Sequence, residues 1–101
     1  MGEGGAMTDE SGEARIKRLR MRAWRRGTKE MDIVLGPYAD AHLGGMDAAA
    51  LGAFDALLLE NDQDLAAWIT GQMPAPEAHG ALVARIAAYA HSRHRSAREG
   101  Q

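Results

Sequence analysis

The sequence contains no cysteine, which excludes disulfides, thiolate catalysis and zinc or iron–sulfur sites built on cysteine. Long apolar runs are also missing, because runs such as residues 56–59 are far too short to cross a membrane. The first residues lack the apolar segment of a secretory signal, and they are acidic where a mitochondrial presequence would carry arginine. These absences predict a cytoplasmic protein.

Residues that favour strands are scarce as well. Val, Ile and Thr are few, whereas Ala and Leu are abundant, and this balance favours helix. A chain of 101 residues has room for one small core, which leaves little space for an enclosed substrate cavity and favours a surface binder over an enzyme. We predict an all-α fold, a compact five-helix bundle over residues 11–95. Residues 1–10 are predicted to be a disordered tail and residues 96–101 a frayed one.

Five segments carry apolar residues at helical spacing, and each begins at a residue suited to a helix start. The predicted N-caps are Ser11, Thr28, Asp47 and Asn61, and the fifth helix starts at Pro76. The first helix is predicted to end at Arg26, because Gly27 can take the positive φ of a C′ residue. The predicted inward residues are Ile16, Leu19, Ala23, Trp24, Met31, Val34, Leu35, Tyr38, His42, Leu51, Phe54, Leu57, Leu58, Leu65, Trp68, Ile69, Leu82, Val83, Ile86, Tyr89 and Ala90.

Basic residues are absent between Lys29 and Arg85, while eight of the twelve lie within residues 15–29. Acidic residues occupy the interval, so the chain has a basic head and an acidic middle. Three interpretations of the head are open: nucleic-acid binding by phosphate neutralisation, a solvated charged face, or recognition of an acidic protein surface or of cofactor phosphates. Nucleic-acid binding by the first helix is our alternative functional hypothesis.

Signatures of catalysis and of metal binding are not found. The sequence has no phosphate-binding glycine loop, no dinucleotide fingerprint and no nucleophile elbow. A calcium loop counted from Asp62 would need glycine and glutamate where Ala67 and Met73 stand. His91 and His94 are interpreted as an exposed pair near a helix C-terminus. We predict no enzymatic activity and no metal site.

The segment 25–32 remains as the candidate site. Gly27 makes a sharp corner between two helices, and Glu30 lies in the first turn of the second, where a carboxylate is stabilised by the helix dipole. Arg26 and Glu30 are therefore predicted to flank the corner as an outward-facing pair of opposite charges. The structural alternative is an ordinary turn with a surface ion pair, which adds little stability.

These residues resemble a known family. The pattern RRGxxExD at 25–32 follows Arg18-Leu19 and precedes Leu58-Leu59-Glu60 and the DQDLAAW stretch at 62–68. Together they resemble the succinate dehydrogenase assembly factor 2 family, whose bacterial members are called SdhE, the flavinylation or FAD assembly factors. The resemblance covers roughly residues 15–89.

The resemblance implies a cytoplasmic bacterial protein that binds the flavoprotein subunit of succinate dehydrogenase, and in some bacteria that of fumarate reductase. It would promote covalent attachment of FAD to that partner without holding a stably bound cofactor itself. Separately, the exposed basic face predicts a monomer when the protein is free. The implied partner-binding residues are Arg26, Gly27 and Glu30, with Arg25, Asp32 and Arg18 beside them. Glu60, Asp64 and Trp68 also match the family, and we interpret them as fold-building.

Overall fold

The structure is a computed structural model that describes residues 12–99. Its elements are α2 (Gly12–Ala23), α3 (Lys29–His42), the 3-10 helix η1 (Leu43–Gly45), α4 (Ala48–Leu58), α5 (Asp62–Ile69) and α6 (Glu77–Glu99). No strand occurs in this part of the chain. The all-α, five-helix prediction is confirmed. The predicted cap at Ser11 lies outside the described residues, and α6 continues past the predicted domain boundary at residue 95.

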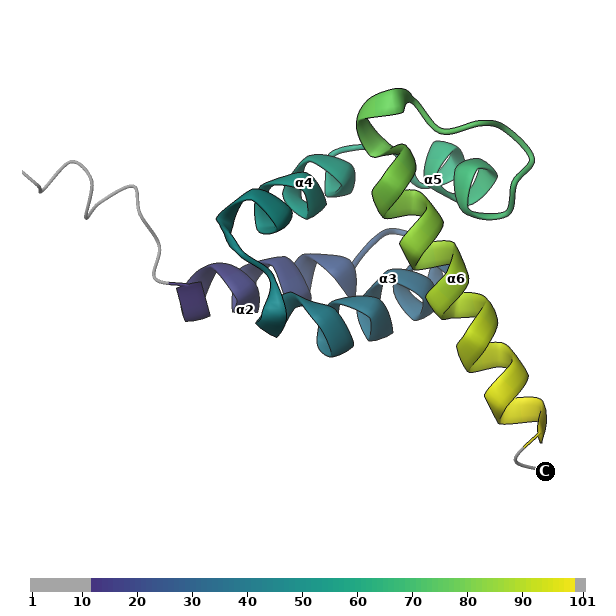
Figure 1. The fold of residues 1–101 in the computed structure, drawn as a ribbon, viewed down its shortest axis with the longest axis horizontal. Coiled ribbons are helices and arrows are strands. Elements are labelled where there is room, and N and C mark those ends of the chain that lie inside the picture. The colour runs from purple at the N-terminus through teal and green to yellow at the C-terminus, as the bar shows by residue number, and fades with distance from the viewer. Residues whose placement is uncertain (1–11, 100–101) are drawn as a thin grey trace, which may run out of the picture.

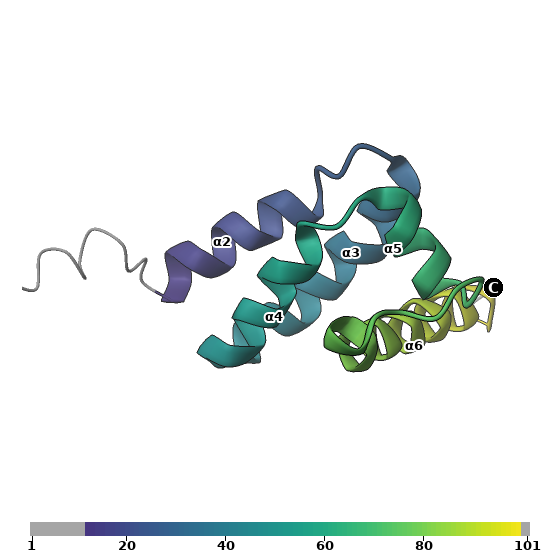
Figure 2. The same cartoon turned by 90° about the horizontal axis from the view of Figure 1, so that it is seen from above.

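Helices α3 and α4 both pack against α2, and α6 packs across α3 and also contacts α4 and α5 (Figures 1 and 2). Short α5 lies beside the turn between α2 and α3, which brings the middle of the chain to the predicted corner (Figure 2). This placement matters for function, because the Arg26 side chain can then reach backbone carbonyls at the end of α4 and in the α4–α5 loop, and Asp62 of α5 can reach the corner.

Local capping chemistry explains why the helices begin where they do. The Thr28 hydroxyl accepts from Met31 N, Asp47 Oδ1 accepts from Ala50 N, and Asn61 Oδ1 accepts from Asp64 N. Each bond satisfies a first-turn N–H group that has no partner inside the helix. The three caps predicted at these positions are confirmed.

The core lies between the helices and is built from apolar side chains of every one of them. Its buried members are Leu19, Ala23, Met31, Leu35, Tyr38, Ala39, Leu43, Leu51, Phe54, Leu57, Leu58, Leu65, Leu82, Val83 and Ile86. Of the other predicted inward residues, Ile16, Val34, Trp68, Ile69 and Tyr89 are partly buried against this core. His42 is exposed, although its ring packs on Tyr38 at a centroid distance of 4.5 Å.

The predicted end of the first helix is wrong. Helix α2 ends at Ala23, and Gly27 does not take positive φ; among the described residues only Gly71 does, at 83°. Just past the helix end, the Trp24 ring lies directly on Gly36, so closely that a Cβ there would stand 2.3 Å from the indole. Trp24 is still 40% exposed, so it covers α3 from outside rather than entering the core.

Candidate functional site

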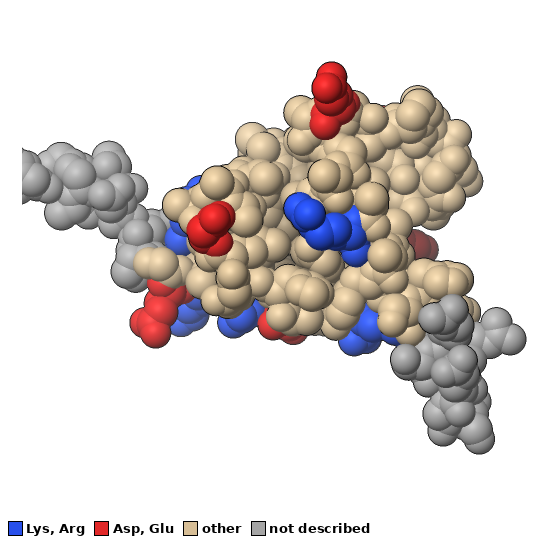
Figure 3. Space-filling model, in the orientation of Figure 1, with Lys and Arg blue, Asp and Glu red and all other residues tan. Residues whose placement is uncertain are grey.

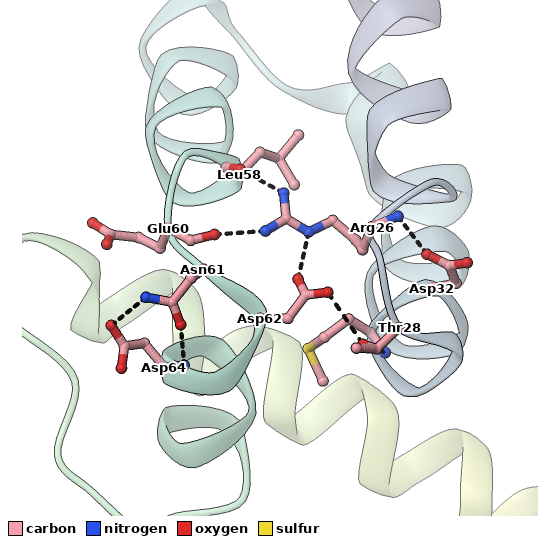
Figure 4. A network of polar contacts seen from close by, with 9 residues as sticks. Arg26, Thr28, Asp32, Leu58, Glu60, Asn61, Asp62 and Asp64 are labelled. Carbon is pink, nitrogen blue, oxygen red and sulfur yellow. Dashed lines mark hydrogen bonds and ion pairs between the residues drawn. The ribbon is translucent and has the colours of Figure 1, made fainter.

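The corner at residues 25–30 is organised by Arg26, whose side chain turns inward and is only 12% exposed. Its guanidinium Nε donates to Asp62 Oδ1 at 2.9 Å, and its two terminal nitrogens donate to the carbonyl oxygens of Leu58 and Glu60 (Figure 4). The planar fork of arginine suits this task, because several N–H groups point in fixed directions. One side chain thereby fastens the corner to the α4–α5 loop.

The backbone of the corner is held as well. Arg26 N donates to Asp32 Oδ1 at 2.6 Å, so the first turn of α3 binds the end of the preceding segment. The Thr28 hydroxyl donates to Asp62 Oδ2 at 3.2 Å (Figure 4). Asp62 thus accepts from both sides of Gly27, and it lies in the first turn of α5, where negative charge is favourable. We call this set of contacts the corner network.

The sequence predicted that Arg26 and Glu30 both face outward. This is wrong for Arg26, whose side chain turns inward, and right for Glu30, whose side chain is exposed. Gly27 is exposed too, and a Cβ added there would meet only Asp62 Oδ2 at 3.5 Å, an ordinary contact distance. The corner thus presents a backbone edge and a carboxylate, while the arginine holds them from behind. Neither positive φ nor a steric clash within the chain therefore requires glycine at this position.

The other predicted site residues divide between the surface and the corner network. Arg25 is exposed, and no carboxylate of the described residues pairs with it. Asp32 faces the corner and accepts from Arg26 N. Arg18 lies on α2, where its Nη2 is 3.8 Å from Asp55 Oδ2. The structure therefore joins Arg26 to Asp32 directly, and Arg18, Arg25 and Arg26 border one hollow of about 460 Å³ along α2.

Folding pairs several arginines of the basic head with aspartates of the acidic middle. Arg22 Nη1 lies 2.7 Å from Asp55 Oδ1, and Arg26 pairs with Asp62. Arg20 Nε is 3.1 Å from Asp40 Oδ1, although its N–H is not aimed at that oxygen, so the contact is an ion pair without a hydrogen bond. On the face drawn in Figure 3, acidic and basic side chains lie scattered among each other over a mainly uncharged surface.

Sequence reasoning missed the role of Asp62, which it treated only as the start of a helix. Arg26 and Asp62 are separated by 36 positions, and no local pattern couples them. Glu60 and Asp64 were interpreted as fold-building, and their contacts agree. Glu60 Oε2 lies 2.9 Å from His79 Nε2, and Asp64 Oδ2 accepts from Asn61 Nδ2 at 2.9 Å.

Metal and membrane chemistry gain no support. Within the described residues, no group of three or more His, Asp or Glu side chains could hold a metal ion. His91 and His94 are both exposed. None of the described helices is long and apolar enough to cross a membrane.

Comparison with known proteins gives a consistent family. The model of the family described as "Flavinator of succinate dehydrogenase" matches residues 17–90. The chain is 39% identical to the FAD assembly factor SdhE of Acetobacter pasteurianus over 64 residues, which is 63% of this chain and 59% of that protein. It is 39% identical to the mitochondrial succinate dehydrogenase assembly factor 2 of Mycosarcoma maydis over 67 residues, 66% of this chain and 28% of that one. The chain thus covers less than two thirds of either relative.

The match contains the whole corner network and most of α6, which are the parts that set the geometry of the site. The chain belongs to the family of succinate dehydrogenase flavinators.

Proposed function

We propose that this protein is an assembly factor that binds the flavoprotein subunit of succinate dehydrogenase and promotes covalent attachment of FAD to it. The observation that carries the proposal is the family match, whose motif residues form one clamped corner in this chain. The names of the relatives, "FAD assembly factor SdhE" and "Succinate dehydrogenase assembly factor 2", support the same activity.

The proposed contribution is positional rather than catalytic. Under this proposal the covalent bond to FAD forms within the flavoprotein, so the factor needs only to hold that protein in a productive arrangement. Placing reacting groups correctly can remove a large part of a barrier, which allows a protein without reactive groups of its own to accelerate a reaction. Under this proposal FAD belongs to the partner, and the free factor is a cytoplasmic monomer. The bacterial origin of the Acetobacter relative supports that location.

Within the site, the proposal assigns different tasks to the motif residues. Arg26 and Asp32 hold the corner, and Gly27 and Glu30 contact the partner. A rigid corner loses little conformational freedom on binding, so more of the contact energy is available for affinity. Arg25 is exposed beside them and would favour approach to an acidic partner surface.

The alternative of nucleic-acid binding loses its main support. Arg20, Arg22 and Arg26 each lie beside an aspartate of the same chain. These pairs would have to break before the arginines could neutralise phosphates, and the broken pairs would offset the gain from counterion release.

The proposal is tested in cells that lack the endogenous factor, by measuring covalent flavin fluorescence of the flavoprotein subunit in denaturing gels. Wild-type protein should restore the signal. Glu30→Ala should lower it strongly, and Gly27→Arg should do the same by projecting a long cation over the corner. Glu77→Ala is the matched control, because Glu77 is also an exposed carboxylate in the first turn of a helix.

The outcomes distinguish a failure of the proposed activity from a failure of the proposed binding site. If wild-type protein fails to restore covalent flavin, the proposed activity is wrong. If Glu30→Ala and Gly27→Arg restore it fully, the activity stands but the corner is not the partner-binding site. Circular dichroism of each purified variant verifies that the helical fold is retained.

A further inference from the structure

The outer face of α3 carries an apolar strip that the protein itself covers only in part, since Ile33 and Ala41 are exposed and Val34 and Pro37 are half-buried. Ile33 is 57% exposed, and Val34, Pro37 and Ala41 follow it at helical spacing on the same face. Glu30 stands one turn before this strip, on the same side of the helix. The exposed carboxylate of the corner is therefore the first residue of a longer surface.

Two hollows lie along this strip, between α3 and neighbouring elements. One of about 320 Å³ is lined by Trp24, Pro37, Asp40, Ala41, Tyr89 and Arg93. The other, of about 370 Å³, is lined by Ile33, Val34, Ala90, Arg93 and His94. Arg93 borders both hollows, and we refer to the two together as the α3–α6 groove. Its floor is α3, and α6 forms one wall.

Two aromatic side chains of the groove are held in place before any partner arrives. The Trp24 ring lies on Gly36, and its Nε1 donates to Asp40 Oδ2 at 3.2 Å. Tyr89 meets the ring of Tyr38 edge-on at 5.8 Å. Rigid tryptophan and tyrosine side chains beside an arginine are the composition of binding hot spots, because they offer large contact areas at little entropic cost.

The charged residues in and beside the groove differ in whether they already have a partner within the chain. Arg93 stacks on Tyr89 at 5.8 Å, but no carboxylate of the described residues pairs with it. Asp40 is already engaged by Trp24 and Arg20. Glu30 has no cationic partner among the described side chains. An occupant should therefore be apolar, with a carboxylate that reaches Arg93 and a cationic or N–H group towards Glu30.

We propose that the α3–α6 groove is an extension of the partner-binding corner and receives an apolar segment of the flavoprotein subunit that carries a carboxylate opposite Arg93. This inference rests on the proposed function. Continuity favours this occupant over others: Ile33 lies one helical turn, about 5 Å, from Glu30. A protein seated on the corner would therefore cover the start of the groove without any rearrangement.

The test measures the affinity of the purified full-length chain for the isolated flavoprotein subunit, with two groove variants and two matched controls. Ile33→Asp and Arg93→Glu should each weaken binding by about tenfold or more, as expected for hot-spot positions. Met73→Asp is the control for the first variant, because Met73 is 53% exposed in the α5–α6 loop outside both hollows. Arg85→Glu, an exposed arginine of the same helix, is the control for the second.

The control variants should bind within about twofold of wild type, since isolated surface changes outside an interface alter affinity little. If both groove variants also bind like wild type while Glu30→Ala binds weakly, the groove inference is overturned and the proposed function stands. If wild-type protein does not bind the flavoprotein subunit, the proposed function itself fails.

Two further outcomes would replace the occupant. A wild-type dimer in sedimentation experiments that Ile33→Asp dissociates would assign the groove to a second copy of this chain. Flavoprotein binding that tightens when residues 1–11 are removed, in the wild type but not in Arg93→Glu, would assign it to the chain's own acidic N-terminal segment. Either result overturns the inference as stated. Thermal unfolding verifies that both groove variants fold, and Arg93→Glu keeps the test decisive if Ile33→Asp does not.

Discussion

Replacing Arg26 by alanine tests the claim that this residue holds the corner from behind. The change removes three hydrogen bonds at once, to Leu58 O, Glu60 O and Asp62 Oδ1. It also leaves the Asp62 carboxylate, whose side chain is 17% exposed, without its cation. Net losses of about 1.5–3 kcal/mol are usual for one hydrogen bond to a charged group, and about 3–5 kcal/mol for breaking a buried ion pair.

These contributions overlap, since the same side chain makes all of them, so we expect a loss of about 3 kcal/mol in the free energy of unfolding. In a domain of this size each kcal/mol lowers the melting temperature by about 4–8 °C, which predicts a decrease of about 12–24 °C. Arg26→Lys should lose less, about 1–2 kcal/mol, because an ammonium keeps the charge but cannot serve three divergent acceptors.

The measurement is thermal and urea unfolding followed by circular dichroism at 222 nm. Arg25→Ala is the control. Arg25 is the exposed neighbour of Arg26, and its replacement should change the free energy of unfolding by no more than about 0.5 kcal/mol. A melting temperature of Arg26→Ala within about 3 °C of wild type, which corresponds to less than 1 kcal/mol, would refute the structural role. In that case Arg26 would have to be regarded as a contact residue, as the sequence pattern first suggested.

Two other perturbations test the local physics of the fold, both by the same unfolding measurements. Gly36→Ala should lower the free energy of unfolding by about 1–3 kcal/mol, because the added Cβ would stand 2.3 Å from the Trp24 ring. Gly80→Ala is its control. It should be neutral or stabilising by up to about 1 kcal/mol, since nothing lies within 4 Å of a Cβ there. Asp47→Ala should cost about 1 kcal/mol by removing the N-cap of α4, and an unchanged midpoint would show that the cap bond adds nothing.

Much of the fold could be predicted because its causes are local. An N-cap bond joins residues three positions apart, so Thr28, Asp47 and Asn61 could each be recognised from the sequence. The inward faces of the helices followed from periodicity for the same reason. The end of the first helix was not predicted correctly in this way, and the segment that follows it is held by non-local contacts, from Arg26 N to Asp32 and from the Arg26 side chain to Asp62.

The sequence was enough to locate the candidate site but not to predict which way its side chains face. The sequence alone determined which residues stand at the corner, since the motif from Arg25 to Asp32 is continuous along the chain. Only the tertiary structure decided which way they face. Arg26 turns inward because its acceptors come from 32 to 36 positions away, and an arginine that finds three fixed oxygens is more stable there than in water. Long-range pairing of the same kind joins arginines of the basic head to aspartates of the acidic middle. Glu30 stays exposed at the start of the α3–α6 groove.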